Sequence, residues 1–314
     1  AELISHQLLI KSGLIHQVAS GIYSYMPMAW RSIKKIENIV RHEINQAGGQ
    51  EVKMPVLQPQ EIWDISGRTE IFGPDLFKLT DRRKRKLVMA PTHEEILTLM
   101  VKSHVNTYKD LPILIYQIQT KFRDETRPRG GLIRVREFDM KDAYSFDISN
   151  EGLDKNYNAM ISAYENIYNR IGLETIKVEA DSGAIGGKAS HEFMAVSEIG
   201  EDTILKCSKC SYAANSEKAQ FVRIKQKKFS EKILPLEEIS TPEMKTIESL
   251  TKNLSIDYDQ ILKTLIYIDS DDQPLAAIIR ADLDVNETKL SNLNGGKDLR
   301  LATSEELSNL NIPH

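Results

Sequence analysis

Apolar residues recur at spacings of three and four along two stretches in the first half of the chain. One stripe runs through residues 33–47 and another through residues 153–171, and a glycine follows each stripe. Such spacing places the apolar side chains on one helix face, and glycine commonly ends a helix. The pattern predicts helices over 33–47 and 151–171, a short strand over 50–54 and a further helix after Pro91.

Apolar runs of strand type lie between these helices without a regular alternation of strand and helix. That order is typical of an α+β fold, with an antiparallel sheet flanked by helices, rather than of a doubly wound sheet. Beyond residue 240, Thr241 and Pro242 form a helix-start signal, and strands are predicted over 265–268 and 275–279. We expect a second, smaller α/β domain in this part.

A basic run with few aromatic residues, followed by two prolines in polar surroundings, separates the two parts. Charge runs and prolines are common in linkers. The predicted domains are therefore residues 1–222 and 223–314. The residues that mark the linker are Arg223, Lys225, Lys227, Lys228, Lys232, Pro235 and Pro242.

Length and charge exclude some classes of protein. The chain has 314 residues, 41 Lys and Arg and 45 Asp and Glu, which gives a net charge of −4. This length suits about two domains, and this charge excludes a polypeptide whose whole surface is basic. A contact with nucleic acid must therefore be a local patch. The run Arg82–Lys86 is either such a patch or a solvated hairpin.

The two cysteines exclude a disulfide scaffold and fit a reducing compartment, so we expect a cytoplasmic protein. Cys207 and Cys210 have the spacing of a zinc knuckle, but no second cysteine pair and no nearby histidine completes four ligands, so we expect no metal site. The uncharged stretch 12–30 contains too many polar residues to span a membrane, and we expect no membrane partner.

The segment 117–141 carries the most candidate chemistry. With a period of two, five polar residues share one strand face: Gln117, Gln119, Lys121, Arg123 and Glu125. After a turn-rich stretch, a return strand puts Arg134, Arg136 and Phe138 on a single face. Guanidinium groups suit phosphate oxygens, and a ring can stack. The pair of strands is therefore a candidate nucleotide site, and a solvent-facing hairpin is the alternative.

This segment resembles motif 2 of the class II aminoacyl-tRNA synthetases, an aromatic-Arg-x-Glu strand, a loop and an Arg-x-x-x-Phe strand. The sequence has F-R-D-E at 122–125 and R-V-R-E-F at 134–138. The resemblance implies that Arg123 holds the α-phosphate of ATP and the substrate carboxylate, and that Glu125 contributes to adenine binding. It also implies that Phe138 stacks on adenine and makes Arg134 a candidate ligand of the terminal phosphate.

Several other strings are similar to the bacterial prolyl-tRNA synthetase family: S-G-I-Y-S-Y at 20–25, P-T-H-E-E at 91–95, R-E-F-D-M-K-D-A-Y-S-F at 136–146 and H-E-F at 191–193. The resemblance covers essentially all of residues 1–222. It implies that Thr92 and Glu94 bind the imino group of proline, with Arg123 and His191 in the same pocket. From the residues alone, Thr92 and Glu95 also form a capping-box pattern, and His191 could be a structural hydrogen-bonding residue.

Residues 223–314 resemble, more loosely, the insertion domain of the same family, which hydrolyses mischarged alanyl-tRNA. Editing is also expected on physical grounds, because a pocket for proline cannot exclude the smaller alanine, and each lost methylene contact discriminates by only roughly 1–3 kcal/mol. The family's Asn-Glu-x-Lys stretch matches residues 286–289, which makes Lys289 a candidate editing residue; a surface lysine is the alternative. The stretch 301–306 is also similar to the insertion, and it matches a helix cap as well.

The resemblance implies a two-step reaction. The carboxylate of L-proline attacks the α-phosphorus of ATP, and the terminal ribose hydroxyl of tRNA(Pro) then attacks the prolyl-adenylate. Positioning and charge stabilisation by arginines and Mg²⁺ suffice for such transfers, so no dedicated base is required. The helix and strand that end at Pro55 are similar to motif 1, the dimer-forming element, which implies a homodimer. Arg123, Glu125 and Lys289 are the residues to which the resemblance gives catalytic roles.

The sequence departs from the family at its end, where we find no motif 3 arginine and no anticodon-binding domain. We therefore expect a fragment that by itself is inactive in adenylation. Three other interpretations stay open: a synthetase-like protein that binds a ligand or RNA without charging tRNA, another class II synthetase of the same subgroup such as the threonyl enzyme, and a second domain that acts alone as a hydrolase.

Overall fold

The structure is a computed structural model that describes residues 3–182, 190–220, 235–242, 244 and 246–312. The chain divides into two compact units, Ala1–Ile176 and Lys177–His314. The domain boundary expected between residues 222 and 223 falls among residues outside this description and stays a prediction.

The described part of the first unit contains both helices and sheets. Its helices are α1 (Ile4–Lys11), α2 (Pro27–Gln46), α3 (Gln60–Ile65), α4 (Arg68–Phe72), α5 (Glu94–His104) and α6 (Asn150–Ile171). Its strands are β1 (Ile15–Ala19), β2 (Ile22–Tyr25), β3 (Gln50–Glu51), β4 (Leu57–Pro59), β5 (Lys78–Thr80), β6 (Lys86–Met89), β7 (Ile113–Phe122) and β8 (Glu137–Phe146). The sheets are β1-β2, β3-β7-β8 and β4-β6-β5.

The long antiparallel pair β7–β8 is the centre of the first unit. Its register runs without interruption from Ile113 opposite Phe146 to Phe122 opposite Glu137. The strand β3 adds to the edge of β7 in parallel, with Gln50 opposite Ile115. The expected α+β class is confirmed, and the parallel pairing of β3 is a departure from a purely antiparallel sheet.

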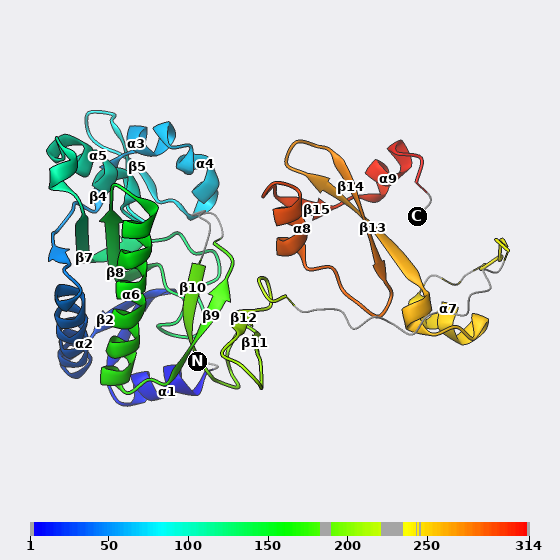
Figure 1. Cartoon of the computed structure of the whole chain (residues 1–314), viewed down its shortest axis with the longest axis horizontal. Coiled ribbons are helices and arrows are strands. Elements are labelled where there is room, and N and C mark those ends of the chain that lie inside the picture. Colours follow the sequence, from blue (N-terminus) through cyan, green and yellow to red (C-terminus); the bar gives the residue numbers. More distant parts are fainter. Residues whose placement is uncertain (1–2, 183–189, 221–234, 243, 245, 313–314) are drawn as a thin grey trace. The chain divides into compact units, whose positions relative to one another are not determined.

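Helices cover both faces of this pair, as the sequence patterns require. On one face, Ile44 of α2 and Ile167 of α6 pack against Tyr116 of β7 in a buried cluster. On the other face, the apolar side of α5 packs against Ile115 and Phe146 in a second cluster. Because neighbouring residues of a strand point to opposite faces, Ile115 and Tyr116 belong to different cores. Figure 1 shows α6 running along the β7–β8 pair.

The predicted helices are present, and the errors lie at element ends. α6 begins after Ser149, whose hydroxyl accepts a hydrogen bond from the Gly152 N–H, and it ends at Gly172, which has a left-handed backbone conformation. α2 begins at Pro27, before its apolar stripe. The strand expected over 50–54 is limited to Gln50–Glu51.

The basic run 82–86 lies at the turn of the hairpin β5–β6, and its side chains are exposed. Asp81 holds the turn: one of its carboxylate oxygens accepts hydrogen bonds from the N–H groups of Arg83 and Arg85, each at 2.8 Å. The other oxygen pairs with the Arg85 side chain at 2.7 Å. A solvated hairpin is therefore the structure of this run.

The second unit contains two described sheets, in the strand orders β10-β9-β12-β11 and β14-β13-β15. Its helices are α7 (Ile247–Leu254), α8 (Glu287–Leu293) and α9 (Ser304–Asn309). Its strands are β9 (Thr175–Ala180), which crosses the division between the units, β10 (Ser190–Ala195), β11 (Ile204–Lys206), β12 (Ala213–Asn215), β13 (Leu262–Asp269), β14 (Pro274–Arg280) and β15 (Leu299–Leu301).

The helix start expected at Thr241 is wrong. α7 begins at Ile247, and the Thr246 hydroxyl caps it by accepting a hydrogen bond from the Ser249 N–H at 3.2 Å. The cap in the stretch 301–306 is confirmed, because Thr303 and Glu306 form a capping box at the start of α9. The two strands expected on either side of the turn-forming stretch 271–274 are present as β13 and β14, and Pro274 is already the first residue of β14. None of the helices in the described ranges is long and apolar enough to cross a membrane.

The buried cluster between α2, α6 and β7 predicts a stability difference within one helix. Ile167 is 4% exposed and Ile171, one turn later, is 37% exposed. Ile167→Ala should lower the free energy of unfolding by roughly 2–5 kcal/mol, because it leaves a cavity. Ile171→Ala should cost less than about 1 kcal/mol. Both tryptophans, Trp30 and Trp63, lie in the first unit, so fluorescence during urea unfolding measures it. Equal losses would contradict this core assignment.

Candidate functional site

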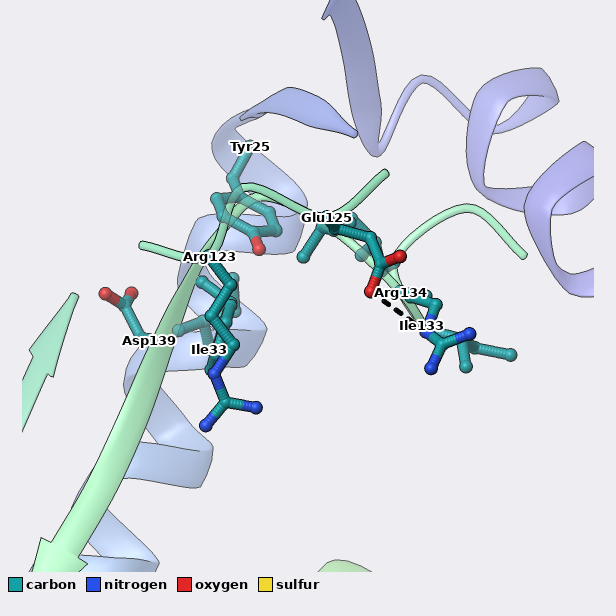
Figure 2. Close-up of a pocket in the computed structure, with 10 residues that line it drawn as sticks. Tyr25, Ile33, Arg123, Glu125, Ile133, Arg134 and Asp139 are labelled. Carbon is teal, nitrogen blue, oxygen red and sulfur yellow. Dashed lines mark ion pairs between the residues drawn. The ribbon is translucent and has the colours of Figure 1, made fainter. Parts of the chain in front are cut away.

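A pocket of about 520 Å³ opens beside the β7–β8 pair, at the end where β7 stops and β8 starts. This volume is in the usual range for small-molecule sites. All four residues expected to bind ATP line it (Figure 2). The lining residues are Tyr25, Ile33, Arg123, Glu125, Leu132, Ile133, Arg134, Val135, Phe138 and Asp139.

Arg123 is the partly buried cation of this pocket. Its guanidinium carbon lies 5.3 Å from the centre of the Phe138 ring. Burial lowers the pKa of Arg123, while the nearby carboxylates of Asp75, Glu94 and Glu125 act in the opposite direction. Within the described part of the chain, its buried Nε has no hydrogen-bond partner. A cation that has lost water without gaining full compensation favours an anionic ligand.

Arg134 and Glu125 form an ion pair at the same pocket, with 3.1 Å between Arg134 Nε and a carboxylate oxygen of Glu125 (Figure 2). Glu125 also accepts a hydrogen bond from the Arg127 N–H at 3.1 Å, within its own loop. The Arg134 side chain is 47% exposed, so the remainder of its guanidinium is accessible to a ligand.

The return strand expected from residue 134 starts later than predicted. β8 begins at Glu137, and Arg134 forms only an isolated bridge with Arg129. Arg136 is not among the residues that line the pocket, because its Nε donates to the carbonyl oxygen of Glu125 at 3.0 Å and supports the loop. The solvent-facing alternative for this hairpin is wrong, because Gln117 and Lys121 are fully buried.

The loop before α5 brings together the residues expected to bind an imino group. The Thr92 hydroxyl donates to the Glu94 carboxylate in a short hydrogen bond. Arg68 Nη1 lies 3.2 Å from Glu94 and 2.8 Å from Glu95. The capping-box interpretation of Thr92 is wrong: the N-cap residue is His93, without a side-chain cap, and Glu95 pairs with Arg68 instead of closing a box.

Beneath this loop lies a buried polar network that the sequence reasoning did not identify. The Lys121 ammonium is 2.8 Å from Asp142 and 2.7 Å from His93 Nδ1. The other carboxylate oxygen of Asp142 accepts hydrogen bonds from Gln117 at 2.9 Å and from the Tyr144 hydroxyl at 2.7 Å. The one available signal was the row of five polar residues on a predicted strand face, which required an explanation.

Arg68 is a further residue that the sequence did not single out. Its guanidinium carbon lies 5.6 Å from the centre of the Trp63 ring and 5.2 Å from that of Phe72. These rings hold the arginine beside Glu94, where it can stabilise the charged carboxylate. Phe72 follows Arg68 by one turn of α4, but Trp63 lies in α3 and Glu94 at the start of α5, so no local pattern indicated the position of Arg68 beside Glu94.

The remaining candidates lie in the second unit. His191 is in β10, and its assignment to the amino-acid pocket stays a prediction. The Asn286 side chain caps α8 by accepting a hydrogen bond from the Lys289 N–H at 3.0 Å, and Lys289 Nζ donates to the Ala219 carbonyl oxygen at 2.6 Å. Lys289 is therefore half-buried rather than a free surface lysine, and its editing role stays a prediction.

Comparison with known proteins agrees with this geometry. The family model described as "tRNA synthetase class II core domain (G, H, P, S and T)" matches residues 77–236, which is half of the chain. A model described as "Aminoacyl-tRNA editing domain" matches residues 241–313. The chain therefore belongs to the class II tRNA synthetases of this group.

The relatives extend the resemblance to bacterial proline–tRNA ligases. A proline–tRNA ligase of Dehalococcoides mccartyi is 58% identical over 98% of this chain and 53% of its own length. One of Caldicellulosiruptor saccharolyticus is 49% identical over 99% of this chain and 54% of its own length. The chain spans about half the length of these curated relatives.

Solved structures confirm the fold. Prolyl-tRNA synthetase of Giardia lamblia, in complex with prolyl-adenylate, has a TM-score of 0.56 at 21% identity and covers 59% of this chain and 39% of its own. The enzyme of Cryptosporidium parvum, with L-proline and AMP, has a TM-score of 0.54 at 20% identity, over 60% of this chain and 38% of its own.

The buried histidine predicts a pH dependence of stability. Burial and the neighbouring Lys121 lower the pKa of His93 from 6.5 to about 4. The histidine of the unfolded chain therefore binds a proton below pH 6.5, whereas His93 of the folded chain binds one only near pH 4. The free energy of unfolding consequently falls as the pH is lowered from 6.5 to about 4.

The comparison variant is His93→Gln, which keeps one hydrogen-bond donor and one acceptor but does not titrate. The stability advantage of the wild type in urea should be largest above pH 6.5 and should shrink towards pH 4. All other titrating groups are common to both proteins. Parallel stability curves over this range would show that His93 is not held neutral.

Proposed function

We propose that this protein catalyses ATP-dependent activation of L-proline and its transfer to tRNA(Pro). The observation that carries the proposal is that Arg123, Glu125, Arg134 and Phe138 all line one pocket. Two guanidinium groups suit phosphates, and a ring beside them suits a base. The identity with proline–tRNA ligases over nearly the whole chain supports proline as the amino acid.

In this proposal Arg123 stabilises the charge that develops when the proline carboxylate attacks the α-phosphorus. A fixed cation in a partly dry site stabilises such charge strongly, because it needs no reorganisation during the reaction. Arg134 binds the terminal phosphates, Phe138 stacks on adenine, and Glu125 orients Arg134 and the adenine-binding loop. The role of these side chains is to position the reactants, and none acts as a general base.

Thr92 and Glu94 bind the imino group of proline. Glu94 supplies the negative charge for the secondary ammonium, and Arg68 and Thr92 fix the position of its carboxylate. His191 is proposed as a further residue of this pocket. The negative charge of Glu94 acts to raise the pKa of Arg123, against the effect of burial.

The proposal includes Mg²⁺ as the counter-ion of the ATP phosphates. Magnesium commonly binds through substrate phosphates with one or two protein carboxylates, and Glu125 and Asp139 line the pocket. Among the described residues, no three His, Cys, Asp or Glu side chains form a group able to hold a metal without the nucleotide. A homodimer and a cytoplasmic location complete the proposal.

The second part of the proposal is hydrolytic editing of mischarged alanyl-tRNA(Pro) by the C-terminal part, with Lys289 in the editing site. The match of an editing-domain model to residues 241–313 supports it. Lys289 follows the Asn286 cap in the first turn of α8, which fixes the start of its side chain.

The synthetase proposal is tested by proline-dependent ATP–pyrophosphate exchange in the full-length protein. Arg123→Lys should lower kcat/KM by roughly 100- to 1,000-fold, because the forked donor is lost at the reacting phosphate. Phe138→Leu should raise the KM for ATP by roughly 3- to 10-fold through loss of stacking.

Arg127→Lys, at an exposed arginine of the same loop, is the matched control and should leave the exchange unchanged. Stimulation by threonine instead of proline would favour another synthetase of the subgroup. Exchange with none of the twenty amino acids would favour a synthetase-like protein without charging activity.

Editing is tested separately, by deacylation of alanyl-tRNA(Pro) with the full-length protein. Lys289→Ala should slow deacylation by at least about tenfold, if its ammonium stabilises charge on the substrate. Lys252→Ala, which removes an exposed lysine from the last turn of α7, is the control. Undiminished deacylation by the Lys289 variant would remove this residue from the editing site.

A further inference from the structure

Lys121 is a fully buried lysine that ends on the underside of the Thr92–Glu94 loop. Its side chain is 0% exposed, and its ammonium contacts Asp142 at 2.8 Å and His93 Nδ1 at 2.7 Å. Asp142 belongs to β8, whereas His93 lies between the two residues proposed to bind the imino group. One ammonium therefore connects the nucleotide-binding strand pair to the amino-acid loop.

The hydrogen-bond partners determine the protonation state of His93. An ammonium can only donate, so Nδ1 accepts from Lys121. The other ring nitrogen, Nε2, lies 3.2 Å from the Pro55 carbonyl oxygen, which can only accept, so Nε2 carries the hydrogen. His93 is thus a neutral ring held from both sides, by Lys121 and by Pro55, and cannot rotate without losing a buried hydrogen bond.

Lys121 also lies close to the reacting centre. It is two residues before Arg123 and directly opposite Phe138 in the strand register. A backbone hydrogen bond from Phe122 to Ala90, at 3.1 Å, fixes the start of the same loop. His93 is the N-cap residue of α5, directly between Thr92 and Glu94. Its contact with Lys121 therefore fixes the part of the loop that carries these two residues.

We propose that Lys121 is a positioning residue for the amino-acid pocket. Its hydrogen bond to His93 fixes the positions of Thr92 and Glu94 relative to Arg123. The expected effect on proline activation rests on the proposed function. The claim that Lys121 holds the loop in place does not depend on that function. Lys121 touches neither substrate in this assignment, so its loss should act on the binding of the amino acid rather than of ATP.

A Lys121 variant could also lose activity because the whole protein is less stable, and this alternative must be distinguished from a shift of the loop. Removing one partner of a buried ion pair is strongly destabilising, because it leaves an unpaired charge, whereas removing both is often nearly neutral. The double variant Lys121→Met/Asp142→Asn removes both charges and leaves the His93 ring without its donor. It should therefore recover much of the stability lost in Lys121→Met but not the position of the loop.

The control is Lys141→Met. Lys141 lies on β8 next to Asp142, and its ammonium donates to the Tyr164 hydroxyl at 2.6 Å. Neighbouring strand residues point to opposite faces, so this substitution removes a comparable lysine hydrogen bond from the face of the pair away from the loop.

Two measurements on the full-length protein test the proposal. In ATP–pyrophosphate exchange, Lys121→Met and the double variant should raise the KM for proline by roughly 10- to 100-fold and change the KM for ATP by less than about threefold. In hydrogen–deuterium exchange, both should increase the exchange of amides in residues 90–97, and Lys141→Met should change neither quantity.

A double variant with wild-type KM for proline and wild-type amide exchange would overturn the proposal and leave Lys121 with a role in charge balance only. Equal increases in the KM for proline and for ATP would also overturn it. If the wild type shows no proline-dependent exchange of pyrophosphate, the proposed function fails, while amide exchange at 90–97 still decides whether Lys121 holds the loop.

Discussion

The pairing of β7 with β8 is the constraint on which the first unit depends. Its uninterrupted register puts Ile115 opposite Tyr144, Gln117 opposite Asp142 and Lys121 opposite Phe138, all on one face. That face therefore changes character along its length, from an apolar part under α5, through a buried polar network, to the pocket at Arg123. A slip of one residue would move this whole series to the face covered by α2 and α6.

Burying the polar residues in the middle of this face costs free energy, and their hydrogen bonds and ion pair offset that cost. Lys121, Asp142, Gln117 and His93 are all buried, and each has a partner of opposite charge or complementary hydrogen-bonding character. Burial lowers the pKa of Lys121, against the effect of Asp142, which raises it. Such a network holds its members rigidly but adds little net stability, so a role in fixing geometry is its better explanation.

Sequence patterns were most successful for long elements and least successful at their ends. The stripes of α2 and α6 were predicted correctly because each helix buries one regular face, and the strands β13 and β14 were predicted correctly because a turn-forming stretch separates two apolar runs. The capping pattern at Thr92 and the helix signal at Thr241 were misleading, since a side chain with a cap-forming residue type can bond elsewhere. At Thr92 that alternative was Glu94, and near Thr241 the cap was Thr246.

The sequence by itself determined the family, the residue types of the nucleotide pocket and the sharing of one face by Gln117, Lys121 and Arg123. Only the tertiary structure decided that Gln117 and Lys121 are buried, that Arg136 supports a loop instead of lining the pocket, and that Arg68 stands beside Glu94. The physical reason is that a strand's period fixes which side chains share a face, whereas the partner that covers the face comes from distant segments. The loop at His93, which contacts Lys121, is such a segment, and so is α4, whose Arg68 contacts Glu94; no local pattern predicts either contact.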